Sequence, residues 1–418
     1  MKAVILAAGK GERLRPLTDD RPKVVLKVAN RPIIEYVMEN LDSFVDEFII
    51  VTRYMMERLI GTLGDEFNGK PITYVEQKPG DGTARAIGSA EEHVDDEFIA
   101  VNGDIYFEAE AVKALISAFR KENADAALVV KNFGDLSHLG KIEVEGNTIR
   151  AVLEKPGNVP GYANLGIYAF KSEVFEFIER TPVSKRGEYE ITDTLNLMIE
   201  AGRRITYATY DGYWNDIGRP WNMLELNEYL LKTKLKHNVK GEVEPGAILI
   251  PPVEVGEGTE IRSGAYIIGP VKIGRNSRIG PNCFIRPYTS IGDNCHVGNA
   301  VEVKNSIIMD SSNAPHLNYV GDSIIGENSN LGAGTITANL RHDRGNVRVE
   351  IKGKLEDSGR HKLGAIIGHN VKTGINVSIY PGRKIGSGSF IGPGVVVDRN
   401  VPPGSLVVVR QEKEVHPR

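Results

Sequence analysis

Over the first 220 residues, short apolar runs alternate with stretches whose apolar residues recur at helical spacing. Four runs are rich in β-branched residues and predict strands: EFIIVT (47–52), PITYVEQ (71–77), EFIAVNGD (97–104) and DAALVVK (125–131). The segments 33–44 and 110–122 carry apolar residues at the spacing of an amphipathic helix. Alternating strands and helices with nearly continuous apolar strands indicate an α/β domain whose mostly parallel sheet is covered on both faces.

Beyond about residue 245 the apolar period changes to six. Apolar residues stand at strict six-residue intervals, often with glycine next to them: Val255, Ile261, Ile267, Ile273, Ile279, Ile285, Ile291, Val297, Val303 and Met309. A hexapeptide repeat of this kind is typical of a parallel β-helix. The stretch opening at Pro220 predicts a connecting helix over about 220–238. We therefore expect two domains, spanning 1–230 and 245–410.

The repeat has two interruptions. Met309 and Ile325 are sixteen residues apart, four more than two repeats require, which predicts that residues 310–321 form a loop outside the coil. A second segment, 340–364, lacks the six-residue period, and the period returns from Ile367 onward. Loops that leave a solenoid often carry its functional residues.

Composition and charge narrow the function classes. The 418 residues are 41% hydrophobic and 25% charged, with a formal net charge of −4, which gives no reason to expect a nucleic acid partner. Without an apolar run of about 18 residues or a cleavable leader, the chain is predicted to be cytoplasmic and not to bind membranes. Cys283 and Cys295 are twelve residues apart, hence on different faces of the coil, so we expect no disulfide.

A glycine-bearing turn follows the first predicted strand. The stretch LAAGKGERLRPLT (6–18) contains two glycines and presents backbone N–H groups in the position where α/β folds bind phosphates. Arg13, Arg15 and Lys23 add positive charge suited to a polyphosphate. The spacing matches neither a GxGxxG dinucleotide fingerprint nor a GxxxxGK[ST] P-loop.

Further motifs occur in a fixed order after this turn. They are RPKVVLKVANRPII, EQKPGDGTARAI, NGD, LGKIEV, LEKPG, YANLGIY, YEITD and WNDIG. Together with the turn, they make residues 1–230 resemble the sugar-1-phosphate nucleotidylyltransferases. The resemblance implies a Rossmann-like domain in which a sugar phosphate oxygen attacks the α-phosphorus of a nucleoside triphosphate. Positioning and charge neutralisation do most of the catalysis in such a reaction.

The resemblance also implies roles for individual residues. Arg13 and Lys23 are expected to be catalytic, the first by drawing charge from the departing pyrophosphate and the second by steadying the reacting phosphates. Nucleotide binding is expected from Leu6, Ala8, Gly9, Lys23, Gln77, Gly82 and Thr83. The sugar phosphate is expected at Gly140, Glu154, Lys155 and Asn164. Asp104 and Asp216, hard oxygen donors that each follow a strand, are the expected Mg²⁺ ligands, although a lone carboxylate in such a place is more often a solvated turn.

Two cations in the repeat region suggest a second site. Arg286 and Lys304 are eighteen residues apart, so they stack on one face of successive coils at about the 4.8 Å spacing of strands. Because stacked cations repel unless an anion lies across them, we expect them to clamp a phosphate. The alternative is that the whole β-helix has only a structural role, as a rigid trimerisation stalk.

Residues 315–322 (PHLNYVGD) and 328–340 (NSNLGAGTITANL) resemble the acetyltransferase half of the bifunctional glucosamine-1-phosphate acetyltransferase and N-acetylglucosamine-1-phosphate uridylyltransferase family. That resemblance implies a left-handed parallel β-helix, a homotrimer or a multiple of three, and His316 as the catalytic general base that takes a proton from the attacking amine. It implies sugar phosphate binding by Arg286, Lys304, Tyr319 and Asn330, and acetyl-CoA binding by Asn339 and Arg410.

The expected function is bifunctional, with acetyl transfer from acetyl-CoA to glucosamine-1-phosphate and uridylyl transfer from UTP to the N-acetylated product. One alternative is a monofunctional glucose-1-phosphate thymidylyltransferase whose β-helix serves assembly or regulation. Another is a regulatory subunit that binds nucleotides without turnover, which the presence of Arg13, Lys23, Asp104 and Asp216 argues against. The sequence leaves open UTP against dTTP and glucosamine against galactosamine, the latter because of the insertion 341–364.

Overall fold

The computed structural model describes residues 1–137, 139–154 and 157–416. The described chain forms two compact units that interleave along the sequence. One unit comprises residues 1–10, 22–25 and 32–216, and the other comprises 11–21, 26–31 and 217–418. Two short segments near the N-terminus therefore belong to the same unit as the β-helix.

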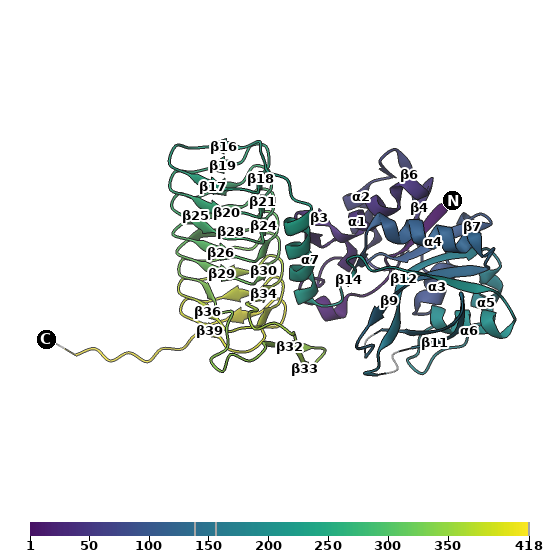
Figure 1. The fold of residues 1–418 in the computed structure, drawn as a ribbon. Helices are drawn as coiled ribbons and strands as arrows, with labels where there is room; N and C mark the ends of the chain where they lie inside the picture. The colour runs from purple at the N-terminus through teal and green to yellow at the C-terminus, as the bar shows by residue number, and fades with distance from the viewer. Residues whose placement is uncertain (138, 155–156, 417–418) are drawn as a thin grey trace. The chain divides into compact units, whose positions relative to one another are not determined.

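The first unit is built on a mixed sheet with strand order β10-β11-β13-β9-β12-β7-β1-β4-β6-β5 (Figure 1). Its central strands β7, β1, β4 and β6 run parallel, whereas β12 runs antiparallel to both of its neighbours. The strands are β1 (Lys2–Leu6), β4 (Glu47–Thr52), β5 (Glu66–Phe67), β6 (Lys70–Glu76), β7 (Glu97–Asn102), β9 (Ala126–Phe133), β10 (Lys141–Glu145), β11 (Thr148–Leu153), β12 (Gly161–Lys171) and β13 (Ile205–Thr209). The small pair β8 (Ile105–Tyr106) and β14 (Asn215–Asp216) lies outside this sheet.

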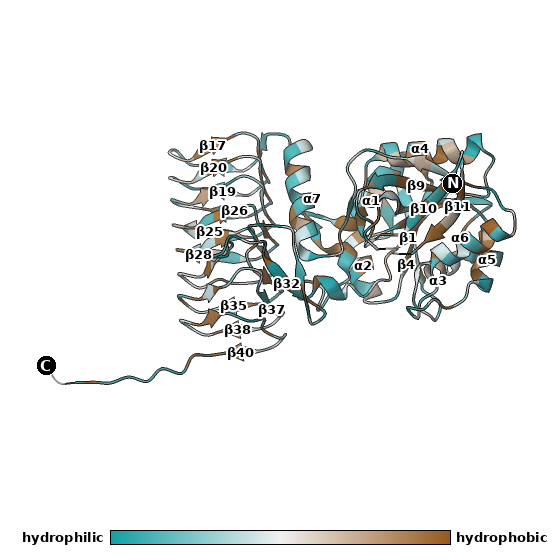
Figure 2. Cartoon of the chain, turned by 60° about the horizontal axis from the view of Figure 1, so that its bottom comes forward, coloured by the Kyte–Doolittle hydropathy of each residue, from teal (hydrophilic) through white to brown (hydrophobic). Residues whose placement is uncertain are grey.

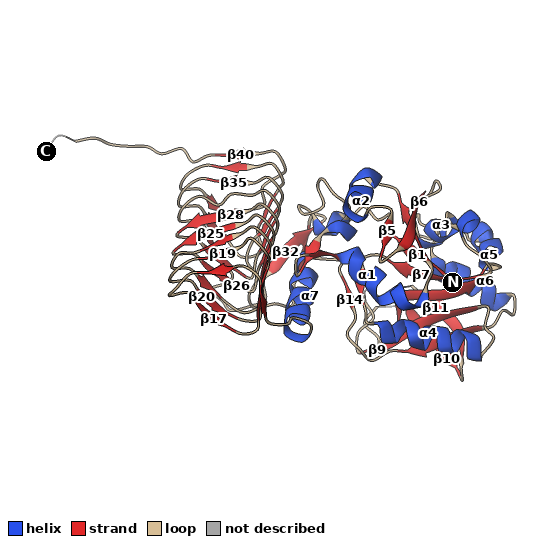
Figure 3. Cartoon of the chain, turned by 90° about the horizontal axis from the view of Figure 1, so that it is seen from above, coloured by secondary structure: helices blue, strands red, loops and turns tan. Residues whose placement is uncertain are grey.

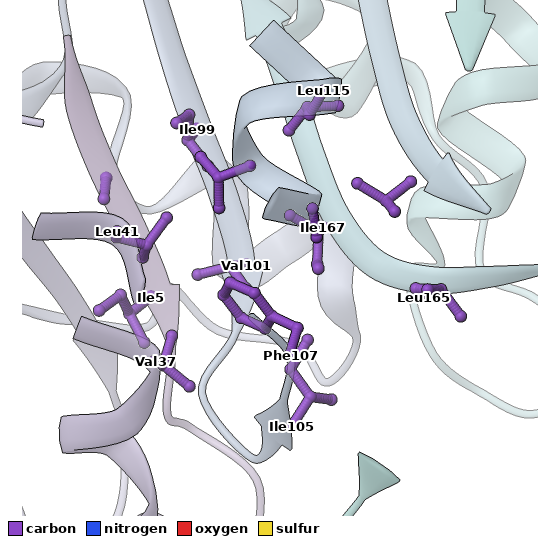
Figure 4. Close-up of a cluster of buried hydrophobic side chains, with 14 of the residues drawn as sticks. Ile5, Val37, Leu41, Ile99, Val101, Ile105, Phe107, Leu115, Leu165 and Ile167 are labelled. Atoms are coloured by element: carbon purple, nitrogen blue, oxygen red, sulfur yellow. The ribbon is translucent and has the colours of Figure 1, made fainter. Parts of the chain in front are cut away.

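Helices cover both faces of the sheet because successive residues of each strand point to opposite sides. Ala3 and Ile5 of β1 join one core cluster with α1 and α4, and Val4 joins a second cluster with α3, α5 and α6. The helices are α1 (Ile33–Leu41), α2 (Met56–Leu63), α3 (Thr83–Gly88), α4 (Ala109–Lys121), α5 (Val174–Arg180) and α6 (Ile191–Glu200). Figure 4 shows the first cluster, in which Ile5, Val101 and Phe107 lie close together with α1 residues Val37 and Leu41.

The second unit contains α7 (Pro220–Thr233) and a parallel β-helix, whose coils are drawn as short strands and turns in Figure 3. Pro220 occupies the first turn of α7, and the backbone N–H of Arg219 donates to Asn222 Oδ1 at 3.0 Å to cap the helix. A helix begins at Pro220 as predicted, and it ends at Thr233 rather than near residue 238. The short strands β2 (Lys27–Val28) and β3 (Arg31–Pro32) precede α1 in the chain.

The β-helix has three faces of parallel strands. The first comprises β15 (Asn238–Val239), β18 (Val253–Val255), β21 (Val271–Ile273), β24 (Thr289–Ile291), β27 (Ile307–Ile308), β30 (Ile324–Ile325), β34 (Ile366–Ile367) and β37 (Lys384–Ile385). The second comprises β16 (Glu242–Val243), β19 (Glu260–Ile261), β22 (Arg278–Ile279), β25 (His296–Asn299), β28 (Asn313–His316), β35 (Lys372–Thr373), β38 (Phe390–Ile391) and β40 (Leu406–Val407). The third comprises β17 (Ile248–Ile250), β20 (Tyr266–Ile268), β23 (Phe284–Ile285), β26 (Glu302–Lys304), β29 (Tyr319–Gly321), β31 (Ile336–Thr337), β36 (Ser378–Ile379) and β39 (Val396–Val397).

The six-residue period arises because nearly every coil contributes one inward aliphatic residue per face, and these residues stack into one core. Threonine takes the inward position at Thr337 and Thr373. Hydropathy along the coils can be followed in Figure 2. One corner of each coil requires a left-handed backbone, which Gly and Asn adopt at low cost. Positive φ recurs there at Gly258, Asn276, Asn294, Ser311, Asn328, Asn370 and Gly388.

The prediction of an ejected loop over 310–321 is wrong. Residues 313–316 and 319–321 form β28 and β29 inside the coil. One coil there has seventeen residues instead of eighteen, because Ile308 pairs with Ile291, Ala314 with Val297 and Val320 with Val303. The pattern was misread because Ile308 rather than Met309 continues the stack, and because the small Ala314 fills the next inward position.

The second excursion is confirmed. Ile325 pairs with Ile367, and β31 pairs with both β29 and β36, so the coil continues through Thr337 and the excursion lies between β31 and β34. It contains an antiparallel hairpin of β32 (Arg348–Ile351) and β33 (Lys354–Asp357). Both cysteines are free and buried in the coil interior, as their spacing predicted. Among the described residues, no helix is long and apolar enough to cross a membrane.

Candidate functional site

The carboxyl ends of β1, β4, β6 and β7 meet at one edge of the first unit's sheet, since these strands are parallel. Ligands of α/β folds bind at this edge. Leu6 ends β1, and its carbonyl accepts a hydrogen bond from the N–H of Gly103 at 2.9 Å. Ala8 and Gly9 follow, and a Cβ added at Gly9 would have no atom within 4 Å. The backbone of the turn is therefore open to a close approach.

Asp104 and Asp216 lie next to each other. Asp104 directly precedes β8, and Asp216 of β14 pairs with Ile105 of that strand. The ammonium of Lys23 forms an ion pair with Asp104, and both side chains are largely buried, 11% and 23% exposed. The structure thus brings Lys23 against Asp104 and places Asp216 on the strand beside Asp104, although the three residues stand far apart in the sequence.

This pair of carboxylates fits a Mg²⁺ ion that is also held by phosphates and water, because Mg²⁺ usually takes only one or two protein carboxylates in such sites. Among the described residues, no group of three or more His, Cys, Asp or Glu side chains could hold a metal by itself. The donor set therefore suits an ion that arrives with a nucleotide rather than a permanent structural metal.

The loop after β6 is tied down at both ends. Gln77 is buried, and its Nε2 donates to the carbonyl of Gly80 at 2.7 Å. Gly82 has φ +120°, and a Cβ there would lie 2.2 Å from the carbonyl oxygen of Tyr189. Thr83 Oγ1 accepts a hydrogen bond from the N–H of Ile191 at 3.0 Å. Gly82 therefore lets the loop pass against the chain that leads into α6.

Gly140, Glu154 and Asn164 also come together. A Cβ at Gly140 would lie 3.5 Å from Glu154 Oε2, and the N–H of Asn164 donates to the Gly140 carbonyl at 2.9 Å. Asn164 Nδ2 donates to the hydroxyl of Tyr168 at 2.8 Å, and burial raises the pKa of that hydroxyl. Lys155, predicted beside them, lies outside the described residues.

Sequence reasoning missed Arg186 in this cluster. Its guanidinium contacts Glu154 at 2.9 Å and Glu190 at 3.1 Å. Neighbouring Asp193 has a raised pKa, first because of burial and then because of the charge of Glu154. No spacing in the sequence singles out Arg186, since it precedes the YEITD motif without belonging to it.

Arg13 lies in the short helix Glu12–Leu14, is exposed, and belongs to the second unit with residues 11–21. The same unit carries the predicted acetyltransferase residues. His316 ends β28, is exposed, and lies opposite Asn299 of the preceding coil. The backbone N–H of His316 donates to Asn318 Oδ1 at 3.3 Å. His316 thus stands at the corner between the second and third faces of the β-helix.

A polar cluster occupies the third face beside this corner. Lys304 Nζ lies 3.0 Å from Asp322 Oδ2. Asn339 Nδ2 donates to the same oxygen at 2.6 Å and to the hydroxyl of Tyr319 at 3.2 Å. Burial raises the pKa of Tyr319. Asp322, only 2% exposed, is the centre of this cluster and was missed, although it stands eighteen residues after Lys304.

The other predicted residues lie at separate positions along the β-helix. Arg286 forms an ion pair with Glu302 at 2.8 Å in the adjoining coil. The two stacked cations therefore each have a carboxylate of the protein, so their repulsion alone does not demand a bound anion. Asn330 lies on the second face, bridging Asn313 and Lys372, and Arg410 is exposed beyond β40.

Comparison with known proteins identifies the class. Residues 2–233 match the nucleotidyl transferase family model, residues 267–380 match the GMPPB C-terminal domain, and residues 364–399 match the bacterial transferase hexapeptide model. A Bacillus anthracis structure with bound sucrose, assigned to the glucose-1-phosphate thymidylyltransferases, aligns at TM-score 0.50 and 30% identity, covering 54% of this chain and 93% of its own. The protein is a nucleotidyltransferase joined to a hexapeptide-repeat transferase domain.

Relatives that match over almost the full length identify the family. "Bifunctional protein GlmU" of Methanocaldococcus jannaschii is 44% identical over 99% of this chain and 98% of its own. "Bifunctional sugar-1-phosphate nucleotidylyltransferase/acetyltransferase" of Sulfurisphaera tokodaii is 43% identical over 98% and 100%. The chain belongs to this family of bifunctional nucleotidylyltransferase and acetyltransferase enzymes, which favours two activities over a monofunctional thymidylyltransferase.

Proposed function

We propose that the protein makes UDP-N-acetylglucosamine in two steps on two sites. The β-helix transfers acetyl from acetyl-CoA to glucosamine-1-phosphate, and the α/β unit transfers a uridylyl group from UTP to the N-acetylated product. The observation that carries the proposal is that Lys23, Asp104 and Asp216 gather at the sheet edge where the nucleotide loops end, while a separate cluster surrounds Asp322 on the β-helix.

In the first unit, the sugar phosphate oxygen forms a bond to the α-phosphorus of UTP as the bond to pyrophosphate breaks. Mg²⁺ bound by Asp104 and Asp216 would supply neutralisation of the phosphate charge. Lys23 already stands against Asp104, so its ammonium is placed to turn toward a phosphate once that carboxylate has another cation. Arg13 follows the glycine turn in the sequence, and its positive charge suits the negative charge that develops on a leaving pyrophosphate.

In the β-helix, the sugar amine attacks the thioester carbonyl, and the C–S bond breaks to release CoA. His316 removes the proton that the amine nitrogen loses, for which an imidazole is suited near neutral pH. Its exposure at the corner leaves it accessible to a substrate. Lys304, Tyr319 and Asn339 lie in one hydrogen-bonded group and orient the sugar phosphate and acetyl-CoA. Asn330 and Arg410 belong to the same proposed site.

We further propose that the active assembly is a homotrimer. The third face of the β-helix carries four exposed apolar residues in one stack of paired positions that also holds Glu302 and Ser378; they are Ile248, Tyr266, Ile336 and Val396, between 37% and 52% exposed. Exposed apolar patches of this kind commonly mark protein interfaces. A cytoplasmic location is supported by the two cysteines that remain free thiols.

The test is to measure thiol release from acetyl-CoA with glucosamine-1-phosphate or galactosamine-1-phosphate, and pyrophosphate release from UTP or dTTP with each N-acetylated sugar phosphate. His316→Ala should abolish thiol release and leave pyrophosphate release intact, whereas His342→Ala, at an exposed histidine of the insertion, should change neither. The better sugar in each assay identifies the epimer. Wild-type protein that makes a nucleotide sugar without any thiol release would contradict the acetyltransferase half.

A further inference from the structure

The segment that carries Arg13 is held by the β-helix. Residues 11–21 follow the glycine turn of the α/β unit, yet they belong to the same compact unit as the coils. Leu14 and Leu17 of the segment are fully buried. Thr18 Oγ1 donates to the Gly11 carbonyl at 2.8 Å, which closes residues 11–18 into one loop with Arg13 inside it. Whatever fixes residues 16–19 therefore also fixes the loop around Arg13.

His369, a buried residue of the β-helix, contacts this loop. Its side chain is fully buried, and its Nδ1 accepts a hydrogen bond from the N–H of Glu327 at 2.9 Å. Since Nδ1 is the acceptor, the proton of the neutral ring lies on Nε2, which donates to the Leu17 carbonyl at 2.9 Å. Burial, with a further contribution from the charge of Arg21, lowers the pKa of His369 and favours this neutral form. The imidazole thus links a coil of the β-helix to the loop.

Ser387 makes a second link beside the first. Its hydroxyl accepts a hydrogen bond from the N–H of His369 at 3.0 Å and donates to the Pro16 carbonyl at 3.1 Å. Its own N–H donates to Asp19 Oδ2 at 3.1 Å. Two neighbouring coils therefore hold Pro16, Leu17 and Asp19 through hydrogen bonds that continue into one another.

Ion pairs and a hydrogen bond to the β-helix hold the chain before and after Lys23. Arg21, 7% exposed, contacts Glu327 at 2.6 Å. Lys27 contacts Asp310 at 2.5 Å. Asn30 Nδ2 donates to the Ile291 carbonyl at 2.6 Å. The insertion contributes as well, because Lys352 in the turn between β32 and β33 contacts Glu12, next to Arg13, at 2.5 Å.

We propose that the β-helix is a working part of the nucleotidyltransferase reaction, in which His369 and Ser387 are positioning residues that hold the loop 11–21 in the shape Arg13 needs. The inference rests on the proposed function, since it assigns Arg13 a role at the departing pyrophosphate. It also gives the insertion 341–364 a purpose, because Lys352 steadies the same loop from its other end.

The experiment uses the full-length protein and both of its activities. Ser387→Ala removes the hydroxyl contact to Pro16 with little change in volume, and His369→Gln retains a donor while losing the Nδ1 acceptor. The matched control is Ser389→Ala, because the Ser389 hydroxyl donates to Pro402 in the same way without contacting the loop. We expect kcat/KM for UTP to fall about tenfold in Ser387→Ala and less in His369→Gln, with thiol release within twofold of wild type. Ser389→Ala should change neither activity.

A double-mutant cycle separates positioning from general stability. If Ser387 acts through Arg13, then Arg13→Ala should lower kcat/KM for UTP by a smaller factor in the Ser387→Ala background than in wild type. An equal factor in both backgrounds would overturn the proposal. So would an unchanged kcat/KM for UTP in Ser387→Ala and His369→Gln, or a parallel fall of both activities.

The outcome also distinguishes this inference from the proposed function. Wild-type protein that releases no pyrophosphate from UTP or dTTP with any of the sugar phosphates would refute both. Active wild-type protein whose uridylyl transfer is insensitive to Ser387→Ala would refute the positioning role and leave the proposed function standing.

Discussion

Gly9→Ala tests whether the turn after β1 holds the triphosphate. The position is chosen because a Cβ there meets no atom within 4 Å, and the backbone at Gly9 does not have a positive φ. The folded structure therefore accepts the methyl group without strain. Replacing glycine in such a position stabilises a protein by about 0.4–1 kcal/mol through the entropy of the unfolded chain. We expect the melting temperature to stay the same or to rise slightly.

Nucleotide binding should respond in the opposite direction. A methyl group at residue 9 keeps a phosphate from reaching the backbone N–H groups, and a hydrogen bond to a charged group contributes about 1.5–3 kcal/mol. Loss of one such contact corresponds to an increase of about tenfold to a hundredfold in KM for UTP. The assay is pyrophosphate release against UTP concentration, with thiol release measured on the same preparation to show that the β-helix is intact.

Gly61→Ala is the matched control. Gly61 lies within α2, and an added Cβ there also meets nothing within 4 Å. Alanine should stabilise this helix by about 0.5–1 kcal/mol and leave KM for UTP unchanged. If Gly9→Ala keeps KM within twofold of wild type, the backbone at residue 9 does not contact the triphosphate. A fall in melting temperature of several degrees in Gly9→Ala would instead show that the open space around Gly9 was misjudged.

Two further predictions concern the metal and pH. Asp216→Asn should raise the Mg²⁺ concentration needed for half-maximal pyrophosphate release about tenfold or more, because an amide oxygen is a weaker ligand than a carboxylate; an unchanged Mg²⁺ titration would contradict the assignment. The pKa of His369 is lowered in the folded protein, so the unfolded state binds the extra proton, and stability falls as the pH drops below the unfolded value of about 6.5. The charges of Asp20 and Glu327 partly offset the effect of burial and of Arg21 on this pKa. The free energy of unfolding, measured with denaturant between about pH 5 and 8, should therefore fall toward low pH in wild type and fall less in His369→Gln. Equal dependence on pH in the two proteins would refute this role of His369.

The sequence predicted most of the elements because their signals are local. The strand predicted at 47–52 has the same bounds in the structure, and the helix at Pro220 starts at the residue that favours a first turn. The inward aliphatic residues of the coils followed from a period that a parallel β-helix enforces. The one failure, at Met309, came from counting only large apolar residues, since Ala314 fills an inward position in a coil one residue shorter.

The anchoring of residues 11–21 could not be predicted in the same way. Leu17 and His369 are 352 residues apart, and a repeat fixes the spacing within the coils but not what lies against them. The sequence does not mark His369 as a contact residue either, because it replaces no inward aliphatic residue and leaves the six-residue pattern undisturbed. Asp322 was not predicted for a related reason, because it is the contacts of its carboxylate with three other side chains that single it out, and these contacts are not visible in the sequence.

Those partners make the two predicted phosphate-binding cations unequal. Asp322 is 2% exposed and is contacted by Lys304, Asn305 and Asn339. Removing Lys304 leaves a buried carboxylate without its cation, which typically costs about 3–5 kcal/mol. The pair of Arg286 with Glu302 is more than a third exposed on both sides, and such pairs contribute about 0–1 kcal/mol.

Arg286 is therefore the cation that can exchange its carboxylate for a phosphate at little cost, whereas Lys304 would bind a phosphate while it keeps its contact with Asp322. We expect Arg286→Ala to raise KM for glucosamine-1-phosphate in the thiol-release assay while the free energy of unfolding stays within about 1 kcal/mol of wild type. Lys304→Met should lower the free energy of unfolding by about 3 kcal/mol or more. A Lys304 variant as stable as wild type would mean that Asp322 does not depend on this ammonium, and the clamp would then consist of both cations equally.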